Sequence, residues 1–193
     1  MSAKETSGID LSGKQVSGRV SEEQATEAAS LVEGLADRKR WFAAWQGLME
    51  LGMAALPATR SGLHHGDWHV RKWCAAFLDH HADPESLHDL IPLLHDPKSQ
   101  VRLWAVHSLS CDRCKTDANP IDVVPHLIER IELDESIRVR RMAVAMLSTR
   151  PPDARLARLF ATLIAKETDR KLRLHAERGL KRCREVGLAS GGV

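Results

Sequence analysis

A spaced pattern of five residues returns along the chain and constrains the fold more than any other sequence feature. Its clearest copy is Asp96, Val101, Arg102, Ala105 and Leu109. The same spacing returns at Asp134, Val139, Arg140, Ala143 and Leu147, more loosely at Glu167, Leu172, Arg173, Ala176 and Leu180, and in part at Val70, Arg71, Cys74 and Leu78. The aliphatic positions 70, 101, 139 and 172 lie 31, 38 and 33 residues apart. A period of this length indicates an array of stacked repeats.

Each repeat is predicted to be a pair of helices. Val101, Ala105 and Leu109 recur every fourth residue, so they form one apolar stripe along a helix, and that stripe must be buried. A second periodic apolar segment precedes each such helix: Leu87, Leu90, Ile91 and Leu94; Val123, Val124, Leu127, Ile128 and Ile131; Leu156, Leu159, Phe160, Leu163 and Ile164. Asp83-Pro84 and Asp96-Pro97 each place a capping carboxylate before a proline that suits a first helical turn.

Two further helices are predicted before the repeats. Ser21 and Gln24 form a capping-box pattern that begins a helix running to about Leu35. A second helix is expected to start near Asp37 and to end before Gly52, with a broad apolar face made by Trp41, Phe42, Trp45, Leu48 and Leu51. Because the terminal unit of an array has to cover its exposed core, these two helices are interpreted as a cap.

The combination of a capping Asp, a proline and Val-Arg followed by Ala and Leu resembles the short-period HEAT repeats, a class also seen in phycobilisome lyase-like proteins. The resemblance covers roughly residues 56–180 and implies an all-α, right-handed α-solenoid of HEAT-like helix pairs with an N-terminal helical cap. Tetratricopeptide and ankyrin repeats fit less well, since the chain has no Tyr and lacks the Thr-Pro-Leu-His signature. In the HEAT family the Asp and the Arg commonly form a ladder between repeats, which implies structural roles for Asp96, Asp134, Arg102 and Arg140. The first repeat departs from the pattern, with His65 where the Asp should be, although Asp67 is close enough to cap.

One domain is expected over residues 21–186, between a disordered tail at 1–20 and a frayed end at 187–193. The first twenty residues contain scattered charges, Ser and Gly but no apolar core, so they predict neither a secretory signal nor a membrane span. Four cysteines without an export signal favour a reducing compartment. We therefore expect a cytoplasmic protein that does not associate with membranes.

A row of large side chains is predicted along one edge of the stack. Counted from the Val-Arg pair, Trp73 and Trp104 occupy the same place in adjacent repeats, and Met142 and His175 follow. The position lies one turn from the buried stripe, which favours packing between helices. The alternative is a partner-binding surface formed by Trp73, Trp104, Arg71 and Arg102, in which the indole rings could also stack on bases.

Four residues form a candidate zinc site. His107 and Cys111 are four residues apart, and Cys114 completes a Cys-x-x-Cys spacing in which two thiolates can hold one ion. Repeat alignment places His80 opposite Cys111, one helix away at about 8 to 10 Å between axes. Two other interpretations stay open. A redox dithiol would need a βαβ setting that this sequence lacks, and the insertion CDRCKTDANP could carry no metal and contact a partner instead.

The predicted function is that of a non-enzymatic scaffold or adaptor that binds a protein partner through one face of the array. The alternatives are a nucleic-acid-binding protein similar to HEAT-like DNA glycosylases and a lyase-like enzyme accessory. Seven cations in the last helix could bind phosphates, but a solvated outer face is favoured because the formal net charge is only +2. The sequence has no Gly-rich phosphate loop and no His-Glu-x-x-His motif, and no catalytic Asp can be carried over from the glycosylases, so an enzyme is unsupported.

Overall fold

The computed structural model describes residues 20–114 and 119–188, and every regular element in these two ranges is helical. The elements are α1 (Glu22–Gly34), α2 (Trp41–Leu51), η1 (Gly52–Ala55), α3 (Leu56–Gly62), α4 (Trp68–Phe77), α5 (Pro84–Leu93), α6 (Ser99–Ser110), α7 (Val123–Leu133), α8 (Ile137–Thr149), α9 (Ala154–Lys166) and α10 (Arg170–Glu185). The tails predicted at 1–20 and 187–193 lie largely outside the described residues. In the described ranges no helix combines the length and the apolar composition that a membrane crossing requires.

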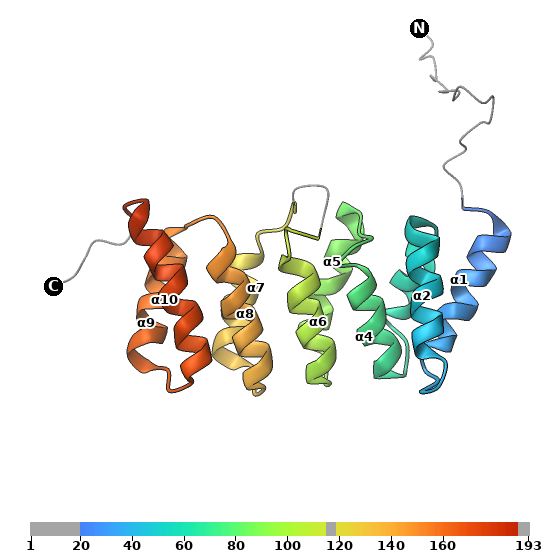
Figure 1. The fold of residues 1–193 in the computed structure, drawn as a ribbon, viewed down its shortest axis with the longest axis horizontal. Coiled ribbons are helices and arrows are strands. Elements are labelled where there is room, and N and C mark those ends of the chain that lie inside the picture. The colour runs from blue at the N-terminus through green and yellow to red at the C-terminus, as the bar shows by residue number, and fades with distance from the viewer. Residues whose placement is uncertain (1–19, 115–118, 189–193) are drawn as a thin grey trace, which may run out of the picture.

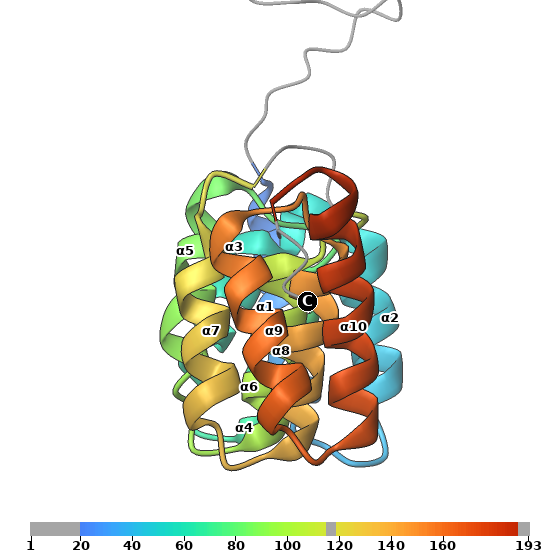
Figure 2. The same cartoon turned by 90° about the vertical axis from the view of Figure 1, so that its left-hand side faces the viewer.

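The helices stack as pairs in two rows. Helices α2, α4, α6, α8 and α10 lie side by side in Figure 1, and the view in Figure 2 shows α5, α7 and α9 in the other row. Contacts join the pairs α1/α2, α3/α4, α5/α6, α7/α8 and α9/α10, and they also join α4 to α6, α6 to α8, and α8 to α10. The predicted α-solenoid, with four helix pairs after a helical cap, is confirmed.

The predicted apolar stripes form the core. Val101, Ala105 and Leu109 of α6 have no exposed surface, and the equivalent residues of α4, α8 and α10 are buried with them: Val70, Cys74, Leu78, Val139, Ala143, Leu147, Leu172, Ala176 and Leu180. Gly179 allows α10 to approach α9 closely, because a methyl group at this position would overlap the ring of Phe160. Each pair therefore closes over one shared layer of side chains.

Two helix starts differ from the prediction. Helix α2 begins at Trp41 rather than near Asp37, because the Asp37 carboxylate accepts a hydrogen bond from the Lys39 backbone N–H at 2.8 Å within a turn that precedes the helix. Asp96 does not cap α6, whose N-cap is Lys98. The Asp96 Oδ1 atom instead accepts a hydrogen bond from the Lys98 backbone N–H at 2.8 Å, which fixes the turn between α5 and α6. The capping box predicted at Ser21 forms. Asp83 caps α5 as predicted, and it also forms a capping box with Ser86.

Candidate interaction surface and metal centre

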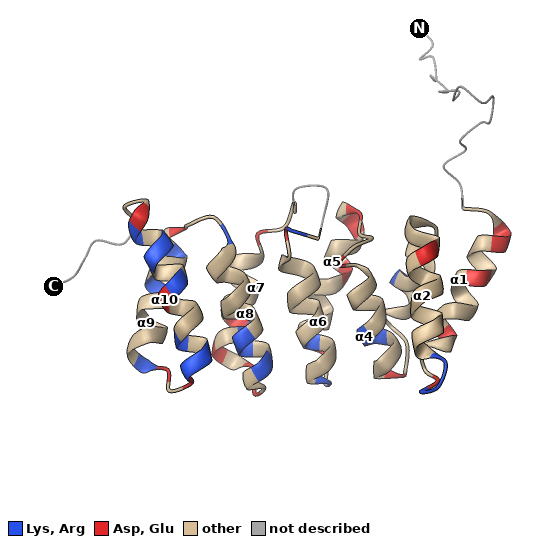
Figure 3. Ribbon diagram, viewed as in Figure 1, with Lys and Arg blue, Asp and Glu red and all other residues tan. Residues whose placement is uncertain are grey.

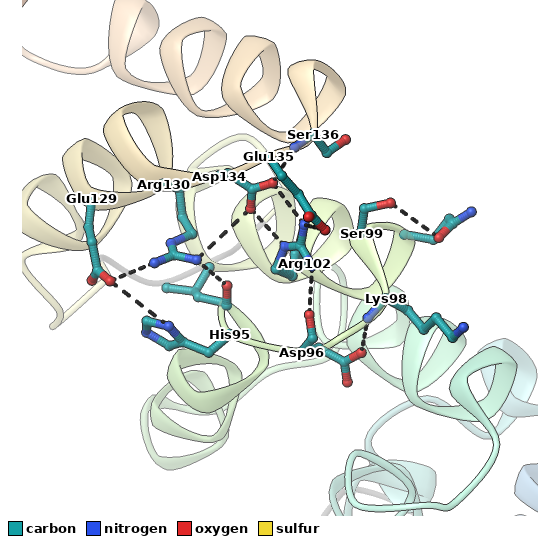
Figure 4. Close-up of polar contacts among 12 residues, drawn as sticks. His95, Asp96, Lys98, Ser99, Arg102, Glu129, Arg130, Asp134, Glu135 and Ser136 are labelled. Carbon is teal, nitrogen blue, oxygen red and sulfur yellow. Dashed lines mark hydrogen bonds and ion pairs between the residues drawn. The ribbon is translucent and has the colours of Figure 1, made fainter.

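An arginine of one repeat binds an acidic residue in the inter-helix turn of the next. Arg102 of α6 donates from Nε and Nη2 to the two carboxylate oxygens of Asp134, at 2.7 and 2.8 Å, as Figure 4 shows. Its Nη1 donates to the Asp96 carbonyl oxygen at 2.8 Å. Asp134 Oδ1 also accepts the Ser136 N–H at 2.8 Å. One buried guanidinium therefore joins its own turn to the turn of the following repeat, and the hydrogen bonds with Asp134 raise the pKa of Arg102.

Equivalent arginine–carboxylate contacts lie on both sides of the Arg102–Asp134 ion pair. Arg71 of α4 binds Asp96 through Nε and Nη2 at 2.7 and 3.1 Å, while Nη1 donates to the His65 carbonyl at 2.8 Å. Arg140 of α8 donates to Glu167 Oε2 at 3.1 Å. The resemblance implied this ladder, and Glu167 serves in place of Asp in its last rung. Because the guanidinium groups of Arg71 and Arg102 are engaged within the array, they leave little donor capacity for a partner.

The tryptophan row extends further than the sequence pattern predicted. Trp73 and Trp104 lie in adjacent helices with ring centroids 6.4 Å apart. Trp41 of the cap stacks on Trp73 at 4.6 Å and an interplanar angle of 11°, and Trp45 lies 5.1 Å from Trp73. All four rings are half-buried, whereas neighbouring Phe42 is 55% exposed. We call these five residues the tryptophan surface. Met142 and His175, the next positions in the predicted row, are also half-buried.

A pocket of about 410 Å³ opens between the cap and α4, beside the stacked pair Trp41 and Trp73. Arg38, His69 and Lys72 contribute its polar lining. The Lys72 ammonium lies 3.8 Å from the centroid of Trp73, a cation–π geometry. Burial lowers the pKa of Lys72. The remaining lining residues are Leu35 and Ala36. The pocket thus combines aromatic walls with cationic groups.

Lys and Arg are concentrated at the opposite end of the array. Figure 3 shows them on α8 and α10, whereas α1 carries only acidic charges. Part of this positive charge is compensated, because Arg141 forms an ion pair with Asp169. Arg182 is held in place by donating to the Ser148 carbonyl at 2.9 Å. Arg178 and Lys181 are exposed.

The side chains of Asp79, His107, Cys111 and Cys114 converge where α4 and α6 end. One donor atom from each lies within 4.8 Å of every other. His107 Nε2 is 3.2 Å from Asp79 Oδ2, and the two sulfur atoms are 3.1 Å apart. Both cysteines are reduced. Burial raises the pKa of the Cys114 thiol to about 12, and its contacts with Cys111 and Asp79 act in the same direction.

His80, the fourth residue of the predicted zinc site, is not among the residues whose donor atoms converge. Its side chain is 50% exposed, and its Nε2 lies 3.7 Å from Asp79 Oδ2. The physical reason is that α4 ends at Phe77, so the backbone turns and directs the preceding residue, Asp79, inward. Asp79 occupies the same place in its repeat as Ser110, and both are buried. The correspondence does not mark Asp79 as a ligand, because Ser110 is not one of the converging residues.

Comparisons with known proteins match part of the chain to one family model. Residues 25–110 match the family model of HEAT repeats. The matched segment runs from α1 to the end of α6, and the pairs α7/α8 and α9/α10 continue the stack beyond it. The crystal structure of an engineered protein is similar to this chain, with 17% sequence identity and a TM-score of 0.49. The superposition covers 83% of this chain and 80% of the engineered protein. Curated protein sequences give no match.

Proposed function

We propose that the chain is a non-enzymatic HEAT-repeat scaffold that binds a protein partner on the tryptophan surface. HEAT repeats generally serve as protein-interaction scaffolds, and stacked arrays present extended surfaces suited to this role. Trp and Arg are the residues most enriched among those that dominate binding energy at protein interfaces. The tryptophan surface places four indole rings and an exposed Phe42 over three neighbouring helices.

The pocket between the cap and α4 is the observation that carries this proposal. Its aromatic walls, Trp41 and Trp73, can take an apolar side chain, and its cations can pair with an acidic group beside that side chain. We expect the partner to present an apolar residue next to Asp or Glu. Arg71 and Arg102 act indirectly in this proposal, since their contacts with the next repeat hold α4 and α6 at the spacing that aligns Trp73 with Trp104.

Affinity capture from the native lysate, followed by mass spectrometry, tests the proposal with two charge-reversed variants of the full chain. Arg38→Glu/Lys72→Glu changes the pocket, and Arg178→Glu/Lys181→Glu makes the same change in charge on α10. We expect the first variant to lose a protein that wild type and the second variant both retain. Phe42→Ala should weaken the same complex, because the truncated ring is exposed and its loss leaves the core intact.

Two outcomes would contradict the proposal. One is a partner retained by the pocket variant and lost by the α10 variant, which would move the interface to the basic end of the array. The other is that all variants retain the same proteins. Circular dichroism of each variant establishes that the helical fold is kept, so that a lost complex reflects a changed surface.

A further inference from the structure

We propose that Asp79, His107, Cys111 and Cys114 bind one zinc ion that joins the end of α4 to the end of α6 and to the loop that follows α6. The four donors come from two adjacent repeats. They differ from the sequence prediction by having Asp79 in place of His80. The site lies outside the proposed protein-binding pocket and does not depend on it.

The donor set selects zinc. Zinc in proteins takes thiolate, imidazole and carboxylate ligands, and four protein ligands in a tetrahedral arrangement are typical of structural sites. Calcium and magnesium require oxygen ligands, of which this cluster supplies one residue, while two soft thiolates favour zinc among the abundant divalent ions. With all four positions filled by protein, no position is left for a substrate, so the expected role is structural.

The distances require only a small rearrangement. Zinc–ligand bonds of about 2.0 to 2.3 Å place tetrahedral donor atoms about 3.3 to 3.8 Å apart. The nitrogen and the carboxylate oxygen are 3.2 Å apart, and the sulfur atoms 3.1 Å. No two of the four donor atoms are more than 4.8 Å apart, so the longest separation has to shorten by at most about 1 Å. Cys111 and Cys114 lie beyond the last residue of α6, where rotation of their side chains can supply this movement.

Burial and charge support the same assignment. The Asp79 side chain is 3% exposed and faces both thiols and an imidazole. Three negative charges would be costly at this position without a compensating cation, whereas a divalent ion offsets two of them as the thiols release their protons to solvent. His107 and Cys111 also line a pocket of about 490 Å³ that is bounded by Met146 of α8 and Arg182 of α10, and this pocket gives the ion a route to the cluster.

Zinc content and cobalt binding of the full chain test this site. Protein purified under reducing conditions without chelator should contain about one zinc per chain by elemental analysis. After removal of the metal, Co²⁺ should bind in a 1:1 ratio and produce the intense visible absorption and the sulfur charge-transfer band of a tetrahedral thiolate site. Zinc at about 100 times its Kd should raise the Tm of the metal-free protein by roughly 5 to 10 °C.

Two single substitutions check the ligands. Cys114→Ser should lower zinc affinity at least about 100-fold, since even residues behind the ligands change affinity about 10- to 100-fold. Asp79→Asn should weaken binding, whereas His80→Ala should leave the zinc content at one per chain. If a variant fails to fold, Co²⁺ titration of the metal-free wild type still decides whether the site exists.

Three results would overturn the proposal. The first is metal-free protein that gives no thiolate spectrum with excess Co²⁺. The second is loss of zinc in His80→Ala with retention in Asp79→Asn, which would restore the ligand set expected from repeat alignment. The third is a stable Cys111–Cys114 disulfide in protein isolated under reducing conditions, which would identify a redox pair.

Discussion

Trp41 of the cap helix α2 lies nearly parallel to Trp73 of α4, with ring centroids 4.6 Å apart. This stack joins an element outside the repeat motif to the first repeat, and it continues to Trp104 and to the edge of the His107 ring, 5.5 Å from Trp104. The surface proposed to bind a protein and the cluster proposed to bind zinc therefore share a border on α6. A change at His107 is expected to move Trp104 as well.

Breaking the rung between Arg102 and Asp134 should destabilise the array strongly. Arg102→Leu leaves the Asp134 carboxylate, whose side chain has no exposed surface, without its bidentate partner, and we expect a loss of about 3 kcal/mol in the free energy of unfolding. The double variant Arg102→Leu/Asp134→Leu should lose less than Arg102→Leu alone, because the buried Asp134 carboxylate is removed together with its partner. Urea unfolding of the wild type, the single variant and the double variant measures these losses in the free energy of unfolding. A double variant less stable than the single one would show that the ion pair itself is strongly stabilising.

Adding a methyl group at Gly179 should separate α9 from α10. Its Cβ would overlap the Phe160 ring, whose neighbourhood is fully packed, so Gly179→Ala is expected to cost about 1 to 3 kcal/mol. Gly66→Ala is the control, since no atom lies within 4 Å of the added methyl group, and its effect should stay within about 0.5 kcal/mol. Thermal unfolding followed by circular dichroism compares the two. Equal melting temperatures would argue against the close packing of this last pair.

Acid should destabilise the protein through its capping carboxylates. Burial disfavours ionisation of Asp83, but hydrogen bonds from Ser86 outweigh it and lower the pKa, and the Asp67 pKa is lowered chiefly by the His69 backbone N–H. A carboxyl group whose pKa is lower in the folded state than in the unfolded state stabilises the folded protein. This stabilisation is complete above the unfolded-state pKa, near 3.8, and it is lost as the pH falls through the folded-state pKa. Urea midpoints should therefore decrease below about pH 4. Asp83→Asn keeps a capping side chain without titrating, so it should flatten this decrease; an unchanged slope would contradict the assignment.

DNA binding is expected to be weak and independent of sequence. The formal net charge is +2, and some of the cations on α8 and α10 are engaged in contacts within the array. Fluorescence anisotropy at physiological salt should give a Kd above the micromolar range for any duplex. Micromolar or tighter binding that is lost in Trp104→Ala would favour the nucleic-acid alternative over the scaffold.

The fold was predictable because the repeat motif contains both the apolar stripes of the helices and the residues that cap them. A stripe such as Val101, Ala105 and Leu109 can be buried only against a neighbouring helix, so periodicity alone implied the stack. The candidate sites were predictable only where they lie inside the motif. Trp41 belongs to the cap, which does not share the repeat spacing, and Asp79 lies beyond the end of α4, where helical spacing no longer determines direction. Neither position could be obtained by counting from the Val-Arg pair.

The ladder also affects how such an array can change in length. Each ion pair joins the arginine position of one repeat to the acidic position of the next. Inserting or deleting a whole helix pair therefore still gives each arginine a carboxylate in the inter-helix turn of the repeat that follows. Arg173 occupies the arginine position of α10, the last helix that the structure describes. A helix pair added after it, with an acidic residue in the turn between its two helices, would find the arginine partner of that residue already in place. Duplication of whole repeats is therefore a route by which this architecture can grow without first acquiring new interface residues.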